Sequence, residues 1–265
     1  YGHINARLGK NNKVIVGFWK NAEIQESIGR WMDMAVAYNE GFNIKVARFG
    51  DNMRDVAVTD GDKIEAQIQF GWYVDYYGVG DLVEVVHTVS DEDVDALFEE
   101  YQSLYDFDYG RYDQVTWGEH VKVQARYEIA LKRFLEAGGY TAFSSNFQDL
   151  HGLDQLPGLA VQRLMIEGYG FSGEGDWKTA ALSRFMKIMS HNKATGFMED
   201  YTYELASGQE AILQSHMLEV DPTFANAKPK IVVSPLSIGD RKDPARLVFD
   251  NVAGDGIAVS VADFG

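Results

Sequence analysis

Three short segments of the chain carry residue types that could perform acid–base or metal chemistry. Glu174 lies between two glycines in GEGDWK, in a turn before a predicted helix that Asp176 could cap. Glu199 lies among aromatic and apolar residues in GFMEDYTYE, where a carboxylate must be paired or bound to a metal ion to offset desolvation. His216 follows in QSHMLEV. Two carboxylates and an imidazole could together supply proton transfer and cation ligands.

Each of these residues also has a simpler interpretation. Glu174 fits an exposed loop glutamate. His216 falls on a predicted strand, on the same face as Leu218, where a lone histidine is more often an ordinary core or surface residue. The separations along the chain, 25 residues from Glu174 to Glu199 and 17 from Glu199 to His216, are not local metal-binding spacings. The three could converge where the two predicted domains meet, because ligand sites commonly lie in such crevices.

Composition narrows the classes of protein and the kinds of metal site. The chain has 265 residues, with 24 Lys and Arg against 40 Asp and Glu, so its formal net charge is −16. This balance disfavours nucleic acid as a partner, and no apolar run is long enough to span a membrane. With no cysteine, a metal would be held by carboxylate, imidazole or water, which suits Mn²⁺ or Co²⁺ and disfavours structural zinc. A reducing, cytoplasmic location fits the same observation.

Alternating apolar runs and amphipathic segments in the first 190 residues predict an α/β fold with a doubly wound, Rossmann-like parallel sheet covered on both faces. The predicted strands are residues 13–16, 44–49, 56–58, 72–77 and 140–147. Helices are predicted between them, including one capped by Ser90, a long one that stops at Gly138-Gly139, and one over residues 177–189.

The pattern changes beyond residue 190. Period-2 runs predict strands over residues 201–205, 212–220, 231–233, 247–249 and 257–261. Four of the five prolines lie in this part, as is typical of strand edges and turns. We therefore expect a second, antiparallel β-rich domain that begins near residue 190.

The glycines at 168, 170 and 173 match the spelling GxGxxG of a dinucleotide site. A helix is predicted before them, whereas a dinucleotide site needs a strand there. A nucleotide-dependent oxidoreductase is therefore disfavoured.

Several uninterrupted blocks resemble the bacterial L-arabinose isomerase family. They are RFGDNMR (48–54), VAVTDGDK (56–63), DLHGL and QLPGLAVQRLM (149–165), GYGF and GEGDWKTAAL (168–182), FMEDYTY (197–203), SHMLEV (215–220) and DPARL (243–247). The resemblance runs over the whole chain and covers about half of the family's length. It implies a remnant of an N-terminal α/β domain over 1–48, a central α/β domain over 49–190 and the start of a C-terminal β domain over 191–265. Because the chain starts with Tyr1 rather than Met, we expect a piece of a longer chain.

The resemblance implies a metal-dependent aldose–ketose isomerase. Such enzymes convert L-arabinose to L-ribulose, and commonly D-galactose to D-tagatose, through an enediol with Mn²⁺ or Co²⁺. By resemblance, Glu174 and Glu199 are the paired catalytic carboxylates and also metal ligands, and His216 is the third ligand. A fourth ligand, a histidine, is expected beyond Gly265, and a substrate-binding histidine before Tyr1.

Other implications concern the sugar pocket and the assembly. Met53, Phe147 and Ile238 match positions that line the sugar pocket in relatives. Trimers paired into hexamers are expected, with no nucleic acid or membrane partner. The alternative is a non-catalytic sugar-binding module on the same scaffold.

Overall fold

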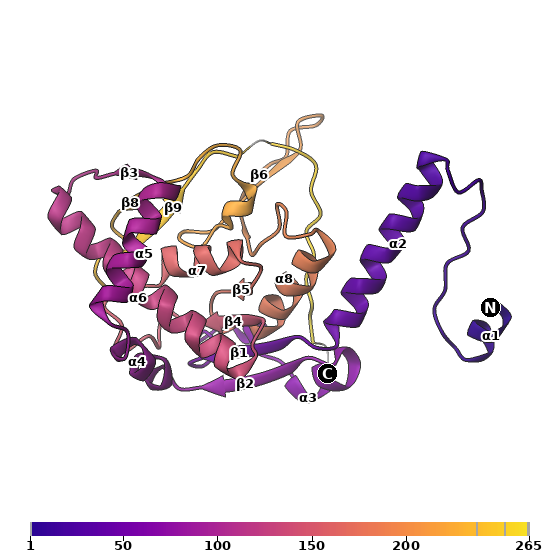
Figure 1. Cartoon of the computed structure of the whole chain (residues 1–265), viewed down its shortest axis with the longest axis horizontal. Coiled ribbons are helices and arrows are strands. Elements are labelled where there is room, and N and C mark those ends of the chain that lie inside the picture. Colours follow the sequence, from indigo (N-terminus) through magenta and orange to yellow (C-terminus); the bar gives the residue numbers. More distant parts are fainter. Residues whose placement is uncertain (1, 237, 252, 264–265) are drawn as a thin grey trace.

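A sheet of four parallel strands, in the order β2, β1, β4, β5, forms the centre of the chain (Figure 1). The computed structural model describes residues 2–236, 238–251 and 253–263. In sheet order, the strands span Tyr73–Tyr77, Lys45–Phe49, Ala142–Ser145 and Gly170–Ser172. The first three confirm predicted strands, whereas the glycine-rich β5 was expected to be a turn.

Helices cover both faces of this sheet. Ala47, Phe49 and Phe143 point into the larger hydrophobic cluster, while Val46 and Ala142, on the alternate positions, point into a smaller one. The larger cluster contains helices α4 (Val79–His87), α5 (Asp91–Leu104), α6 (Gln114–Gly138) and α7 (Gly158–Ile166). The smaller one contains α3 (Lys63–Phe70) and α8 (Trp177–Met189). The predicted α/β fold with a two-sided parallel sheet is therefore confirmed.

The helix ends follow the signals in the sequence. The hydroxyl of Ser90 accepts a hydrogen bond from the amide of Asp93 at the start of α5. Gly139 ends α6 in the left-handed conformation, with φ of 67°. The carboxylate of Asp176 accepts from the amide of Thr179 at the start of α8.

The remaining strands form two smaller sheets. In one, β8 (Lys230–Val233) pairs antiparallel with β9 (Ala245–Val248) and parallel with β3 (Asp106–Asp108). The other is a hairpin of β6 (Glu199–Glu204) and β7 (Ala211–Ser215). The period-2 pattern beyond residue 190 thus predicted β6, β7, β8 and β9. The sequence analysis did not predict β3, which lies earlier in the chain. The division into 1–48, 49–190 and 191–265 stays a prediction, and β1 crosses residue 48.

Three predicted strands are wrong. Residues 13–16 and 257–261 form no strand, because no other strand among the described residues pairs with either segment. Val14, Val16 and Ile257 are 74%, 84% and 87% exposed, so their apolar side chains gain little from burial. Residues 57–59 form a short 3-10 helix, η1 (Ala57–Thr59), because Thr59 bonds back to the carbonyl of Val56 instead of to a strand.

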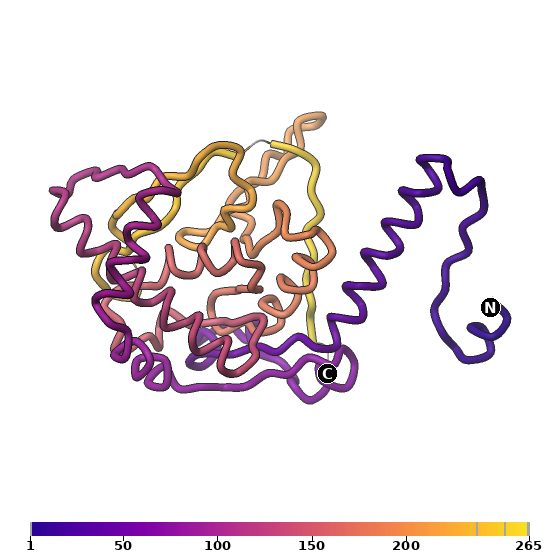
Figure 2. Tube along the Cα trace, in the orientation of Figure 1, coloured from indigo at the N-terminus to yellow at the C-terminus, as the bar shows by residue number. Residues whose placement is uncertain are grey.

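The amino-terminal part is separate from the sheet. Helix α1 (Gly2–Arg7) and the extended chain after it lie apart from the remaining elements (Figure 2). Helix α2 (Ala22–Gly41) leads from this segment back to β1 and packs on α8. Among the described residues, no helix is long and apolar enough to cross a membrane.

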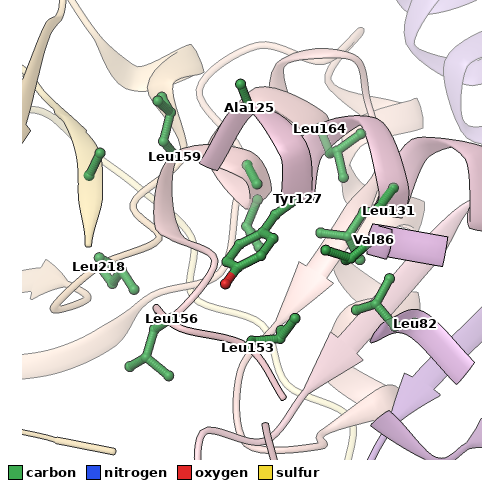
Figure 3. Close-up of a cluster of buried hydrophobic side chains, with 14 of the residues drawn as sticks. Leu82, Val86, Ala125, Tyr127, Leu131, Leu153, Leu156, Leu159, Leu164 and Leu218 are labelled. Atoms are coloured by element: carbon green, nitrogen blue, oxygen red, sulfur yellow. The ribbon is translucent and has the colours of Figure 1, made fainter. Parts of the chain in front are cut away.

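The larger core joins the end of the chain to the central layers (Figure 3). Ala125, Tyr127 and Leu131 of α6 lie among leucines of α4, α7 and the loop before α7. Leu218, which comes between β7 and the short helix η2 (Pro222–Phe224), is 3% exposed in the same cluster. A Cβ on Gly158 would lie 2.6 Å from the Cδ1 atom of Leu218, so a glycine is needed at the start of α7 to admit this leucine.

A buried carboxylate in this core makes stability depend on pH. Glu128 of α6 accepts a hydrogen bond from the hydroxyl of Tyr101 and pairs with Arg163, yet burial raises its pKa from 4.5 to about 7. The folded chain therefore holds this proton more tightly than the unfolded chain does. The free energy of unfolding should fall by up to about 3 kcal/mol as the pH rises from 4.5 through about 7.

Chemical denaturation at several pH values measures this effect. We expect the fall in unfolding free energy to be much smaller in Glu128→Gln, which has no proton to lose in this range. An equal fall in both proteins would assign the pH dependence to other groups.

Candidate active site at the carboxyl edge of the sheet

The turn between β5 and α8 places Glu174 at the carboxyl edge of the parallel sheet. Glu174 has φ of +65°, and Gly175 follows with φ of +76°. A Cβ on Gly175 would lie 2.4 Å from the carbonyl oxygen of Asp51, so only glycine fits there. The side chain of Asp176 then caps α8. Ligands in open α/β sheets commonly bind outside this edge.

Hydrogen bonds hold the turn against the loops after two neighbouring strands. The amide of Met53, after β1, donates to the carbonyl of Glu174 at 2.8 Å. The amide of Gly175 donates to the carbonyl of Ser145 at the end of β4, at 3.1 Å. The side-chain amide of Asn146 joins these loops by donating to the carbonyl of Asn52. Met53 therefore lies beside the Glu174 turn.

Phe147 and Ile238 are both half-buried against the larger core. Phe147 lies in the loop after β4, which also follows the carboxyl edge of the sheet. Ile238 lies between β8 and β9, in a loop whose Arg241 donates to the carbonyl of Leu153 at 2.7 Å. Their role in lining a sugar pocket stays a prediction.

The β6–β7 hairpin brings Glu199 and His216 together. Glu199 is the first residue of β6 and pairs with Ser215, the last residue of β7. His216 comes directly after β7, so it does not share a strand face with Leu218 as the sequence predicted. Antiparallel pairing thus brings Glu199 and His216 close together in space, although they are 17 residues apart in the sequence.

The imidazole of His216 lies over the turn that carries Glu174. A Cβ on Gly173 would lie 3.9 Å from Cε1 and 4.0 Å from Nε2 of this ring. The ring of Phe197 packs edge-on at 4.9 Å between centroids. On the other edge, Nδ1 lies 2.7 Å from Oε2 of Glu219.

The charges in this region act on one another. Burial raises the pKa of Glu174, and the neighbouring charge of Glu199 raises it further, while His216 opposes the shift. Burial lowers the pKa of His216, but contact with Glu219 outweighs this, and Glu199 and Glu174 add to the rise. The two glutamates and the histidine therefore share one neighbourhood. Within the described part of the chain, however, no group of three or more His, Asp or Glu side chains is arranged closely enough to hold a metal ion.

Sequence reasoning missed Glu219, although it belongs to the segment SHMLEV. The central glycine of the GxGxxG spelling has a packing role instead. Gly170 lies within β5, and a Cβ there would lie 2.3 Å from the carbonyl oxygen of Ala180. The spelling therefore reflects close contact between β5 and α8.

Comparison with known proteins identifies the family of the chain. Three family models match successive parts of the chain: the L-arabinose isomerase N-terminal domain over residues 1–43, the central domain over 45–192 and the C-terminal domain over 194–265. The chain therefore belongs to the L-arabinose isomerase family.

Individual relatives carry the same name. The chain is 71% identical over 265 residues to L-arabinose isomerase 2 of Bacillus licheniformis and to L-arabinose isomerase of Oceanobacillus iheyensis, and in each case the match covers all of this chain and 56% of the relative. It is 60% identical over 264 residues to L-arabinose isomerase of Levilactobacillus brevis, again covering 56% of that protein. The chain spans about half the length of the curated relatives it matches.

Proposed function

We propose that this chain supplies the proton-transfer groups of an enzyme that converts L-arabinose to L-ribulose. One observation carries the proposal. His216 lies over the turn that carries Glu174 at the carboxyl edge of the parallel sheet, and Glu199 pairs across the β6–β7 hairpin with Ser215, the residue before His216. The family and the names of the relatives supply the substrate and the class of reaction.

The donor types of these residues suit a divalent cation, although the described side chains are not close enough together to hold one as they stand. The strongest electrostatic influences on Glu174 come from Glu199, His216, Asp176 and Glu219, so three of the four neighbours are acidic. Carboxylate oxygens with one imidazole nitrogen suit Mn²⁺ or Co²⁺, and a cation would offset the repulsion between the carboxylates. We propose Glu174, Glu199 and His216 as its ligands. When bound, the ion would polarise the sugar carbonyl and stabilise charge on the sugar oxygens.

The two carboxylates would carry the proton. Aldose–ketose isomerisation through an enediol removes a proton from C2 of the sugar and delivers one to C1, while a proton moves between the two oxygens. One glutamate takes up the C2 proton and a protonated carboxyl returns it. Burial and the charge of Glu199 raise the pKa of Glu174, which moves its proton exchange toward neutral pH. Met53, Phe147 and Ile238 are proposed to line the sugar pocket.

Metal removal tests this function. In a full-length enzyme that carries this sequence, L-ribulose production should fall by at least about 10²-fold after chelation, because the ion stabilises charge on the sugar oxygens, and should return with Mn²⁺ or Co²⁺. A ketose colour assay measures the product. The same assay with D-galactose tests the wider substrate range.

Two other outcomes would contradict the proposal. Tight binding of L-arabinose without any ketose would indicate a sugar-binding module, and full activity in the presence of the chelator would exclude the metal. The cytoplasmic location and the assembly into trimers and hexamers remain proposals that fractionation and light scattering would test.

A further inference from the structure

We propose that Glu219 is a positioning residue that holds the His216 ring with its proton on Nδ1 and directs Nε2 toward the Glu174 turn. The consequence for metal binding depends on the function proposed above, whereas the state of the ring does not.

The first support is the mutual burial of two polar atoms. Nδ1 of His216 and Oε2 of Glu219 are 2.7 Å apart, and both side chains are only 10% exposed. Among the described residues, neither atom forms a well-aligned hydrogen bond with any partner, and their contact with each other is a close approach of two unsatisfied polar atoms. A buried carboxylate oxygen and a buried ring nitrogen are costly to leave unpaired. The arrangement with the lowest free energy is one in which an Nδ1–H group donates to the carboxylate.

The second support is the rigid backbone that carries Glu219. The guanidinium of Arg246 donates to the carbonyl of Met217, and Leu218 is buried in the main core. The side-chain amide of Gln162 donates to the carbonyl of Val220 at 2.9 Å. Asp221 forms a fully buried ion pair with Lys187. Because the residues around it are anchored, the backbone of Glu219 is held in place before any ligand arrives.

The third support is the direction of the opposite edge of the ring. Nε2 and Cε1 face Gly173, at 4.0 and 3.9 Å from the position that a Cβ would take. The absence of a side chain at Gly173 leaves that edge open next to Glu174. A neutral imidazole with its proton on Nδ1 keeps its lone pair on Nε2. The lone pair therefore points to the side where a metal ion would meet Glu174 and Glu199.

The state of the ring can be measured without metal. The chain labelled with ¹⁵N in its histidine rings is studied by two-bond ¹H–¹⁵N correlation at alkaline pH, where the rings are neutral, and the His216 signals are assigned from their loss in His216→Gln. We expect the Nδ1–H form in the wild-type chain. Glu219→Gln, which keeps an acceptor oxygen, should retain this form, and Glu219→Ala should shift the ring toward Nε2–H.

A wild-type ring with its proton on Nε2, or a ring unchanged in Glu219→Ala, would overturn the inference. If Glu219→Ala does not fold, Glu219→Leu offers a second variant without an acceptor, and the wild-type ring state remains decisive. Glu219 acting only as a packing residue would lower the melting temperature of Glu219→Ala without changing the tautomer.

Metal affinity provides the second readout. In the full-length enzyme, Mn²⁺ titration followed by electron paramagnetic resonance should show about 10- to 100-fold weaker binding in Glu219→Ala and a smaller loss in Glu219→Gln. Glu99→Gln makes the same chemical change at an exposed position of α5 and should bind as the wild type does. Equal affinity in Glu219→Ala and wild type would refute the positioning role. Failure of the wild type itself to bind Mn²⁺ would refute the proposed metal site, while the ring experiment would still decide the role of Glu219.

Discussion

Replacing Glu174 by Gln should lower the turnover of L-arabinose by about 10²- to 10⁴-fold, the range commonly lost with a general acid or base. The substitution keeps the size of the side chain and removes its ability to exchange a proton. Glu174 is half-buried in the neighbourhood of Glu199. The expected loss is in kcat, measured by ketose formation in the full-length enzyme at saturating sugar.

Two controls make this result specific. Glu99→Gln should retain wild-type turnover, because that side chain is exposed on α5. Thermal unfolding of Glu174→Gln should match or exceed that of the wild type, since a partly buried charge with a raised pKa has been removed. Turnover within a few-fold of the wild type would remove Glu174 from the reaction.

Gly175→Ala should destabilise the chain by roughly 2–5 kcal/mol and also reduce activity. An alanine at this position would have to adopt φ of +76°, which side chains rarely allow. Its Cβ would also lie 2.4 Å from the carbonyl oxygen of Asp51 and 2.8 Å from Cα of Asn52. Both neighbours are backbone atoms, so the clash and the strained conformation add together. Relief requires movement of the turn that carries Glu174. Denaturation gives the stability, and the ketose assay gives the activity.

Gly80→Ala is the matched control. Gly80 lies in α4, and a Cβ there has no atom within 4 Å. This substitution should leave stability unchanged or raise it slightly, since alanine favours a helix. Equal stability of Gly175→Ala and Gly80→Ala would contradict the role given to the Asp51 contact.

The central layers could be predicted from the sequence because their signals are local. Asp176 predicted the N-terminal cap of α8, and the helical pattern from Trp177 to Met189 predicted both of its ends. The structure has the same cap and the same bounds. The alternation of apolar runs and amphipathic segments likewise indicated the parallel sheet. The segment from residue 13 to residue 16 failed because a β-branched run becomes a strand only when another strand pairs with it.

Much of the candidate site depends on contacts that no local pattern encodes. The bond from the amide of Met53 to the carbonyl of Glu174 joins residues 121 positions apart. The pairing of Glu199 with Ser215 depends on the length of the β6–β7 turn. Glu219 went unnoticed because its importance arises from a contact with His216 outside any helix, where a spacing of three residues has no fixed meaning.

Leu218 couples the stability of the candidate site to the stability of the main hydrophobic core. It lies between His216 and Glu219 in the sequence, and its side chain belongs to the main core. Local loosening of the imidazole would require this leucine to withdraw from its neighbours around α6 and α7. Heat inactivation should therefore coincide with cooperative melting of the central layers, with no earlier step in which the candidate site unfolds alone.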